Sequence, residues 1–108
     1  LVLMNDPQFV EAARRLAEHA LQQRSDDQSR AEWMLQAVLS RPAHPADVAD
    51  MTSAASDFRN LFQDKPEAAT ELISVGDSKA DETLDATELA AWTLVANTLM
   101  NRDDFLNK

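Results

Sequence analysis

Acidic side chains occur in residues 77–88 at a spacing that could hold a calcium ion. Asp77, Asp81, Asp85 and Glu88 stand at positions 1, 5, 9 and 12 of these twelve residues, with an apolar residue at position 8. Calcium loops between two helices supply oxygen ligands from comparable positions of a twelve-residue segment. The spacing therefore raises calcium binding as one hypothesis for this chain.

Two further residues of the segment count against calcium. Lys79 at position 3 brings a positive charge where a ligand oxygen is needed, and Glu82 at position 6 replaces the glycine that permits the sharp turn. Asp85 and Glu88 also have the spacing of a capping box, in which each side chain accepts a hydrogen bond from the other residue's amide. We therefore expect an acidic capped loop, with no metal ligand assigned, and keep calcium as the weaker alternative.

The other side chains that could do chemistry are isolated from one another. His19 lies on the polar side of the first expected helix, and no ligand-type residue lies three or four positions away. His44 precedes a proline and is expected to cap a helix. No serine lies in a Gly-x-Ser-x-Gly turn, the single glycine cannot make a phosphate loop, and the absence of cysteine excludes thiolate chemistry. The sequence predicts no catalytic residue and no cofactor.

Paired carboxylates and the two tryptophans allow weaker functional interpretations. Asp103 and Asp104 could act as acid and base only in a cleft, and we expect them in a charged tail. Trp33 and Trp92 lie beside apolar stripes and are expected in the core or at the edge of a groove. A groove-edge position would suit a binding function, because stacked helices leave concave surfaces that recognise peptides or neighbouring domains.

Composition restricts the elements that could position these residues. The chain has 108 residues, the size of a single domain that can bury a core. It contains one glycine, six valines, one isoleucine and six threonines, too few turn-forming and β-branched residues for a sheet. We expect a single all-α domain over residues 1–108, folded as a compact antiparallel bundle of about five helices.

Start and stop signals divide the chain into these five helices. The expected starts are Asn5-Asp6-Pro7, a capping box at Ser25 and Gln28, His44-Pro45, Pro66 and Asp85, and the expected ends are near Arg24, at Arg41-Pro42, at Asp64, near Gly76 and at Asn101. Proline suits the first turn of a helix and disfavours the helical conformation in the residue before it. Glycine suits a left-handed C-terminal cap.

Apolar periodicity predicts which faces are buried. The expected stripe of the first helix is Phe9, Ala12, Ala13, Leu16, Ala17 and Ala20, and Leu61 is expected to widen the stripe of the third. The fifth helix, about residues 86–100, is apolar on almost every side. A helix of this kind is enclosed by others. We therefore expect it at the centre, with the first three helices around it.

Charge limits the partners. The net charge is −9, from 19 acidic and 10 basic residues, so the chain repels nucleic acid and anionic membranes. No apolar run approaches the roughly 20 residues that span a bilayer. No signal peptide is visible, and because the chain begins at Leu1 we expect a fragment of a longer protein.

Three blocks of the sequence resemble a domain of unknown function at the C-terminus of many large planctomycete proteins. They are Leu-Met-Asn-Asp-Pro-Gln-Phe-Val-Glu-Ala-Ala at residues 3–13, Leu-Ser-Arg-Pro at 39–42, and residues 88–105, whose Ala-Ala-Trp and Leu-x-Asn-x-Asp-x-Phe pattern is the most specific. Asp104 stands where the family pattern has glutamate. In those proteins the domain often follows a second uncharacterised domain and a cytochrome-c-like domain.

The resemblance implies that the chain is the end of that domain in a multidomain parent that is exported or at the cell surface. It implies no catalytic residue. Haem attachment in such parents needs Cys-x-x-Cys-His, which this chain lacks, so any haem lies elsewhere in the parent. We therefore expect a helical scaffold that packs against other domains of its chain or a protein partner. The alternative is one wall of a catalytic or redox site that other domains complete.

Overall fold

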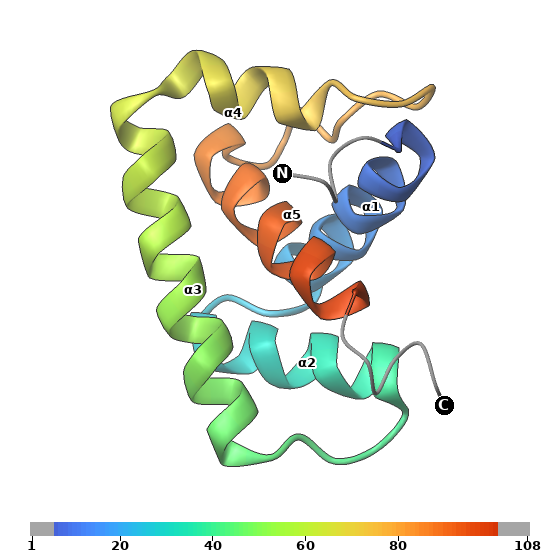
Figure 1. Ribbon diagram of the computed structural model, residues 1–108, viewed down its shortest axis with the longest axis vertical. Coiled ribbons are helices and arrows are strands. Elements are labelled where there is room, and N and C mark those ends of the chain that lie inside the picture. The colour runs from blue at the N-terminus through green and yellow to red at the C-terminus, as the bar shows by residue number, and fades with distance from the viewer. Residues whose placement is uncertain (1–5, 102–108) are drawn as a thin grey trace.

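The computed structural model describes residues 6–101, and within them the chain is all-helical without strands. The five helices are α1 (Pro7–Gln23), α2 (Asp27–Leu39), α3 (Pro45–Asp64), α4 (Pro66–Ile73) and α5 (Ala86–Met100). α2 and α4 run across the two ends of the long α3, and α5 lies between α3 and α1 (Figure 1). The expected all-α fold with five helices is confirmed.

The N-terminus of α1 follows the sequence signals. The Asp6 carboxylate accepts from the amides of Gln8 at 3.0 Å and Phe9 at 3.4 Å, as a capping aspartate does. At α2 the cap is Asp26, which accepts from the Ser29 amide at 3.1 Å. The predicted capping box starting at Ser25 is therefore wrong by one residue, because Ser25 and Asp26 are both good caps and only the backbone decides between them.

Two other helix ends differ from the prediction. α2 ends at Leu39, where Ser40 adopts a left-handed conformation with φ 56°, so the helix stops before Arg41-Pro42 is reached. His44 occupies the N-cap position of α3 but makes no side-chain capping hydrogen bond. Pro45 nevertheless is the first residue of α3, as predicted, because its missing N–H has no helical partner to lose there.

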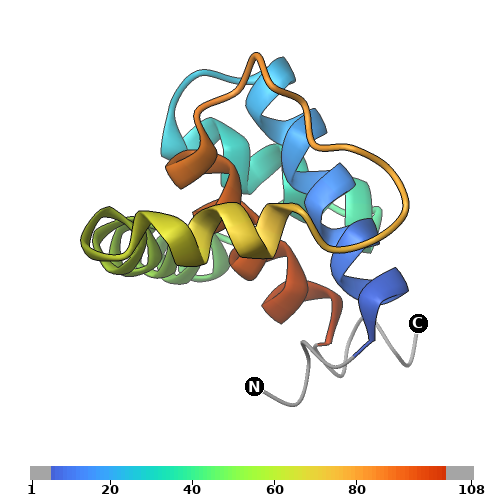
Figure 2. The ribbon, with the colours of Figure 1, turned by 90° about the horizontal axis from the view of Figure 1, so that it is seen from above.

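α5 is the central helix. Ten of its residues are buried: Leu89, Ala90, Ala91, Trp92, Thr93, Leu94, Val95, Ala96, Asn97 and Leu99. α1, α3 and α4 make the most extensive contacts with α5, whereas α2 lies mainly against α3 and α1. The first three helices were expected around α5, but α4 rather than α2 packs beside α1 and α3 on it. Figure 2 shows α4 crossing over α5. The central position itself is confirmed.

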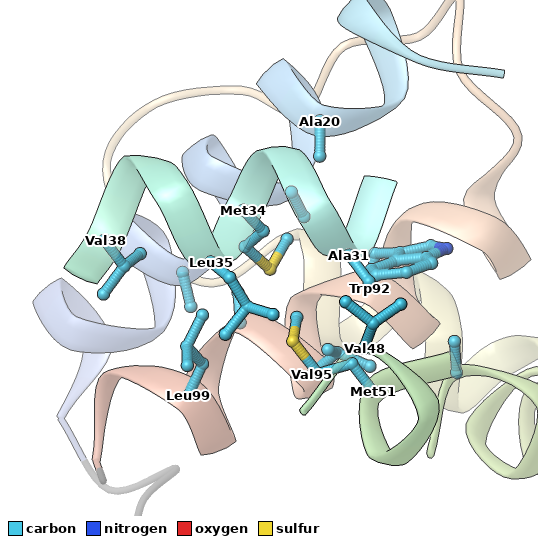
Figure 3. Close-up of a cluster of buried hydrophobic side chains, with 14 of the residues drawn as sticks. Ala20, Ala31, Met34, Leu35, Val38, Val48, Met51, Trp92, Val95 and Leu99 are labelled. Atoms are coloured by element: carbon cyan, nitrogen blue, oxygen red, sulfur yellow. The ribbon is translucent and has the colours of Figure 1, made fainter. Parts of the chain in front are cut away.

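Opposite faces of α5 belong to two core clusters. The larger cluster contains Leu89, Trp92, Val95, Ala96 and Leu99 from α5, which pack against residues of α1, α2 and α3 (Figure 3). The smaller one contains Ala90, Ala91 and Leu94 with Val10, Phe62, Ala69 and Leu72. An all-round apolar helix is needed because each of its faces meets a different neighbour.

The buried stripe of α1 is rotated from the predicted one. Ala12 is exposed and Phe9 only half-buried, while Val10 and Arg14 are buried. Alanines around α1 make several stripes nearly equivalent in hydrophobicity, so periodicity alone leaves the rotation of the helix open. Leu61 does not widen the stripe of α3, since it is 47% exposed.

Candidate functional site

The loop between α4 and α5 is bound along one side of α1. The Glu11 carboxylate accepts from the amides of Asp77 at 3.1 Å and Ser78 at 2.7 Å, and from the Ser78 hydroxyl. About two turns further along α1, the Glu18 carboxylate accepts from the Asp81 amide at 2.9 Å. The loop therefore follows the helix, with α1 side chains substituting for the backbone partners that a loop lacks.

Arg14 lies at the centre of this contact and is 1% exposed. Its Nη1 donates to the carbonyls of Ile73 and Ser78, both at 3.0 Å, and its Nη2 donates to Ser78 Oγ at 2.5 Å. Glu18 Oε2 lies 3.5 Å from Nε. Within the described residues Nε makes no hydrogen bond, and the nearby Glu18 carboxylate balances the charge, as a buried guanidinium requires. We call Glu11, Arg14, Glu18 and Ser78 the loop clamp.

Gly76 lets the loop approach α1. It has φ +101°, and a Cβ atom there would lie 2.5 Å from Glu11 Oε1. Glycine is predicted near here as a helix cap, but the C-cap of α4 is Ser74 and Gly76 serves the turn that follows. The contact also affects acidity: the Ser78 hydroxyl, then the amides of Ser78 and Asp77, then Arg14 lower the pKa of Glu11 to about 2.

A second cluster of charges joins three helices. Arg59 of α3 donates to the Glu88 carboxylate through both Nε and Nη2, and the distance from Nη2 to Glu88 Oε1 is 3.0 Å. Nη2 also donates to Asp27 Oδ1 at 2.9 Å. Arg30 Nη1 lies 3.4 Å from Glu88 Oε1. These hydrogen bonds raise the pKa of Arg59, and the bond to Glu88 has the largest effect. We call these four residues the charge network; it ties the first turns of α2 and α5 to α3.

These contacts separate the four carboxylates of the calcium hypothesis. Asp81 accepts from the Thr83 hydroxyl at 2.6 Å and amide at 2.9 Å, which lowers its pKa, and Asp85 accepts from the Glu88 amide at 3.0 Å. Asp77 contributes its amide, and the Glu88 carboxylate binds the two arginines of the charge network. Within residues 6–101 no group of three or more His, Cys, Asp or Glu is arranged to hold a metal ion.

The capping box at α5 is correspondingly half formed. Asp85 caps the helix as predicted. The Glu88 side chain, expected to reach back to the Asp85 amide, accepts from Arg59 and Arg30 instead. A charged donor makes a stronger hydrogen bond than a backbone amide does, so the tertiary contact replaces the local one.

The remaining sequence candidates stay apart. His19 is exposed and stands edge-on to the half-buried Trp33, with ring centroids 6.4 Å apart. His44 is exposed at the start of α3. Trp92 is fully buried and is a core residue. Asp103 and Asp104 lie outside the described residues.

One depression on the described surface is a groove between α2 and α3. Its volume is about 580 Å³, and it is lined by Asp27, Gln28, Glu32, Ala43, Pro45, Val48, Ala49 and Thr52. A smaller depression of about 320 Å³ lies between α3 and α5. We call the first one the α2–α3 groove. It lies within the volume range of ligand and peptide pockets.

Sequence reasoning missed Arg14 and Arg59. The signal for Arg14 was present, because Glu11 and Glu18 lie three residues before and four residues after it on one helix face. Arg59 had no local signal, since its partners Asp27 and Glu88 are 32 and 29 residues away.

Together these contacts define a small all-α domain whose half-buried charges hold its own elements together. Comparison of the chain with protein-family models, curated proteins and solved structures gave no match. No helix in residues 6–101 has the length and apolar character that crossing a bilayer requires.

Proposed function

We propose that this chain is a helical scaffold and interaction domain without catalytic activity of its own. It packs against other domains of a larger parent chain or against a protein partner. The observation that carries the proposal is the enclosure of α5, with Trp92 and Leu89 at 0% exposure. Because ten of the fifteen residues of α5 are buried, what such a domain presents to other molecules is the outer surface of the surrounding helices.

The engagement of its charged side chains supports a scaffold over an enzyme. Proton transfer needs a titratable group that can reach a substrate and whose pKa lies near the working pH. Glu11 instead has its pKa lowered to about 2 by donors of the loop. Arg14, Arg59 and Glu88 are likewise bound to groups of their own chain. In the described residues the strongest electrostatic contacts therefore serve folding.

The competing proposal makes this domain one wall of a catalytic or redox site that other domains complete. Such a wall would expose a contiguous apolar patch when isolated, larger than about 600 Å². Within residues 6–101, Leu61 is the only large apolar side chain that is exposed. This favours a self-contained domain over an incomplete wall.

The nature of the parent rests on the three sequence blocks. They support a multidomain, exported or cell-surface, planctomycete-type protein in which residues 1–108 form the C-terminal part. The domain then contacts its neighbours in the same chain, through interfaces that are typically modest in area and polar.

Unfolding of the isolated domain tests the proposal. A self-contained scaffold gives one transition in urea, coincident by circular dichroism and by tryptophan fluorescence. In a Trp33→Phe variant the remaining Trp92 should resist acrylamide quenching, because it is buried. Two results would instead support the competing proposal that the domain is one wall of a larger site. These are separate unfolding transitions, or a Trp92 that is readily quenched and becomes protected only when the rest of the parent is added.

A further inference from the structure

The α2–α3 groove has two chemically different walls. Pro45, Val48, Ala49 and Thr52 line it from α3, at a spacing that places them on one face of the helix. Three of these four side chains are apolar, and one of the three, Val48, is a core residue at the base of the wall that is 9% exposed. Gln28 and Glu32 line it from α2, one turn apart, and the Gln28 amide donates to Glu32 at 3.3 Å.

Charge around the groove is negative. The lining contains no lysine or arginine. Arg30 and Arg59 contact the Asp27 and Glu88 carboxylates of the charge network. Asp27 is therefore already neutralised at its end of the groove. Glu32 is exposed, and the neutral Gln28 amide bound to it leaves its charge uncompensated there.

The two helices that line the groove, with the turn between them, carry more acidic than basic residues. Residues 26–64 contain the acids Asp26, Asp27, Glu32, Asp47, Asp50, Asp57 and Asp64 and the bases Arg30, Arg41 and Arg59. A field of this sign attracts cationic partners and repels anionic ones. It also disfavours a second copy of this chain, which carries the same net charge of −9.

We infer that the α2–α3 groove binds a basic segment of a separate protein partner. A lysine or arginine of that segment pairs with Glu32, and its aliphatic stem, with a small apolar neighbour, covers the wall formed by Val48 and Ala49. Long basic side chains suit such a groove because they bury their methylenes and keep the charge at a polar edge. The inference rests on the proposed function, for which it names the partner's chemistry and the surface.

Two substitutions of exposed alanines separate groove binding from general attraction to an acidic domain. Ala49→Arg fills the groove with a cationic side chain, whereas Ala12→Arg makes the same change on the exposed face of α1. Both lower the net negative charge equally. Circular dichroism should first show that each variant is folded.

The probe is a labelled, amidated peptide of 14 residues, made of lysine, alanine and leucine at helical spacing, with a matched peptide that has glutamate in place of lysine. Fluorescence anisotropy at 0.15 M salt measures affinity. We expect the lysine peptide to bind, the glutamate peptide not to bind, Ala49→Arg to weaken binding at least tenfold, and Ala12→Arg to change it less than twofold. Amide shifts on titration should concentrate at Gln28, Glu32, Val48, Ala49 and Thr52.

Equal weakening by the two arginine substitutions, or amide shifts centred on another face, would overturn the groove assignment. Absence of binding by the lysine peptide would overturn it too. These outcomes leave the scaffold proposal standing if the domain still unfolds cooperatively in isolation. Failure of that unfolding test would remove both.

Discussion

Replacing Arg14 with methionine tests whether the loop clamp holds the α4–α5 loop on α1. Methionine keeps most of the aliphatic volume but removes the donors to the Ile73 carbonyl, the Ser78 carbonyl and Ser78 Oγ. It also leaves Glu11 and Glu18 without their cation. The variant therefore isolates the contribution of the guanidinium from that of packing.

The expected loss follows from burial. Removing one partner of a buried ion pair costs about 3–5 kcal/mol. The Glu11 and Glu18 side chains retain 18% and 13% exposure, so water can solvate them once the guanidinium is gone. We therefore expect the low end of that range, about 3 kcal/mol. This is a large part of the roughly 5–15 kcal/mol by which a domain is stable.

Urea unfolding followed by circular dichroism measures the loss of unfolding free energy, and Arg15→Met is the matched control because Arg15 is the exposed neighbour. Hydrogen exchange shows where the structure is weakened. The amides of Asp77, Ser78 and Asp81 should exchange faster in the Arg14 variant, and those of α2 and α3 should change much less. A loss below about 1 kcal/mol, or one equal to that of the control, would refute the reasoning. So would unchanged exchange in the loop.

Three other perturbations follow from the same contacts. Gly76→Ala should destabilise the fold by about 1–3 kcal/mol in thermal unfolding, because φ is +101° and the new Cβ meets Glu11; equal stability would contradict the clamp geometry. Folding lowers the pKa of Glu11 from 4.5 to about 2, so the unfolded chain binds more protons in this interval, and the stability due to Glu11 is present above pH 4.5 and lost as pH falls towards 2. Glu11→Gln should accordingly flatten stability between pH 5 and 2, and a curve parallel to that of the unaltered chain would exclude the effect. Arg59→Met should cost about 1–3 kcal/mol, and 0.5 M salt should narrow its difference from the unaltered chain, because the charge network is partly exposed; a salt-independent difference would point to packing alone.

Local signals predicted the helices well because they depend on neighbours within one turn. Asp6, Pro45, Pro66 and Asp85 each stand at the helix start assigned to them. Errors at helix ends arose where neighbouring residues offered two possible ends. Ser25 and Asp26 are both suitable N-caps of α2, and the structure uses Asp26. At the other end, Ser40 is left-handed, so α2 ends before the Arg41-Pro42 stop signal.

The candidate site was much less predictable. The residues that contribute most to it are Arg14, whose partner Ser78 is 64 positions away, and Arg59, whose partner Glu88 is 29 positions away. No periodicity or cap signals such a pair. The spacing of acidic residues in 77–88 raised calcium binding by one group of carboxylates. In the structure Asp81, Asp85 and Glu88 each accept hydrogen bonds from different donors instead.

What the sequence by itself determined is a five-helix domain with the all-round apolar α5 inside it, since helix ends and amphipathic faces are set by neighbouring residues and by hydrophobicity. The tertiary structure alone decided that α4 packs over α5, that Arg14 is buried on α1, and that Glu88 faces Arg59 and Arg30. A charged side chain can be buried only where donors and acceptors from distant segments converge on it. That convergence exists only once the helices are packed.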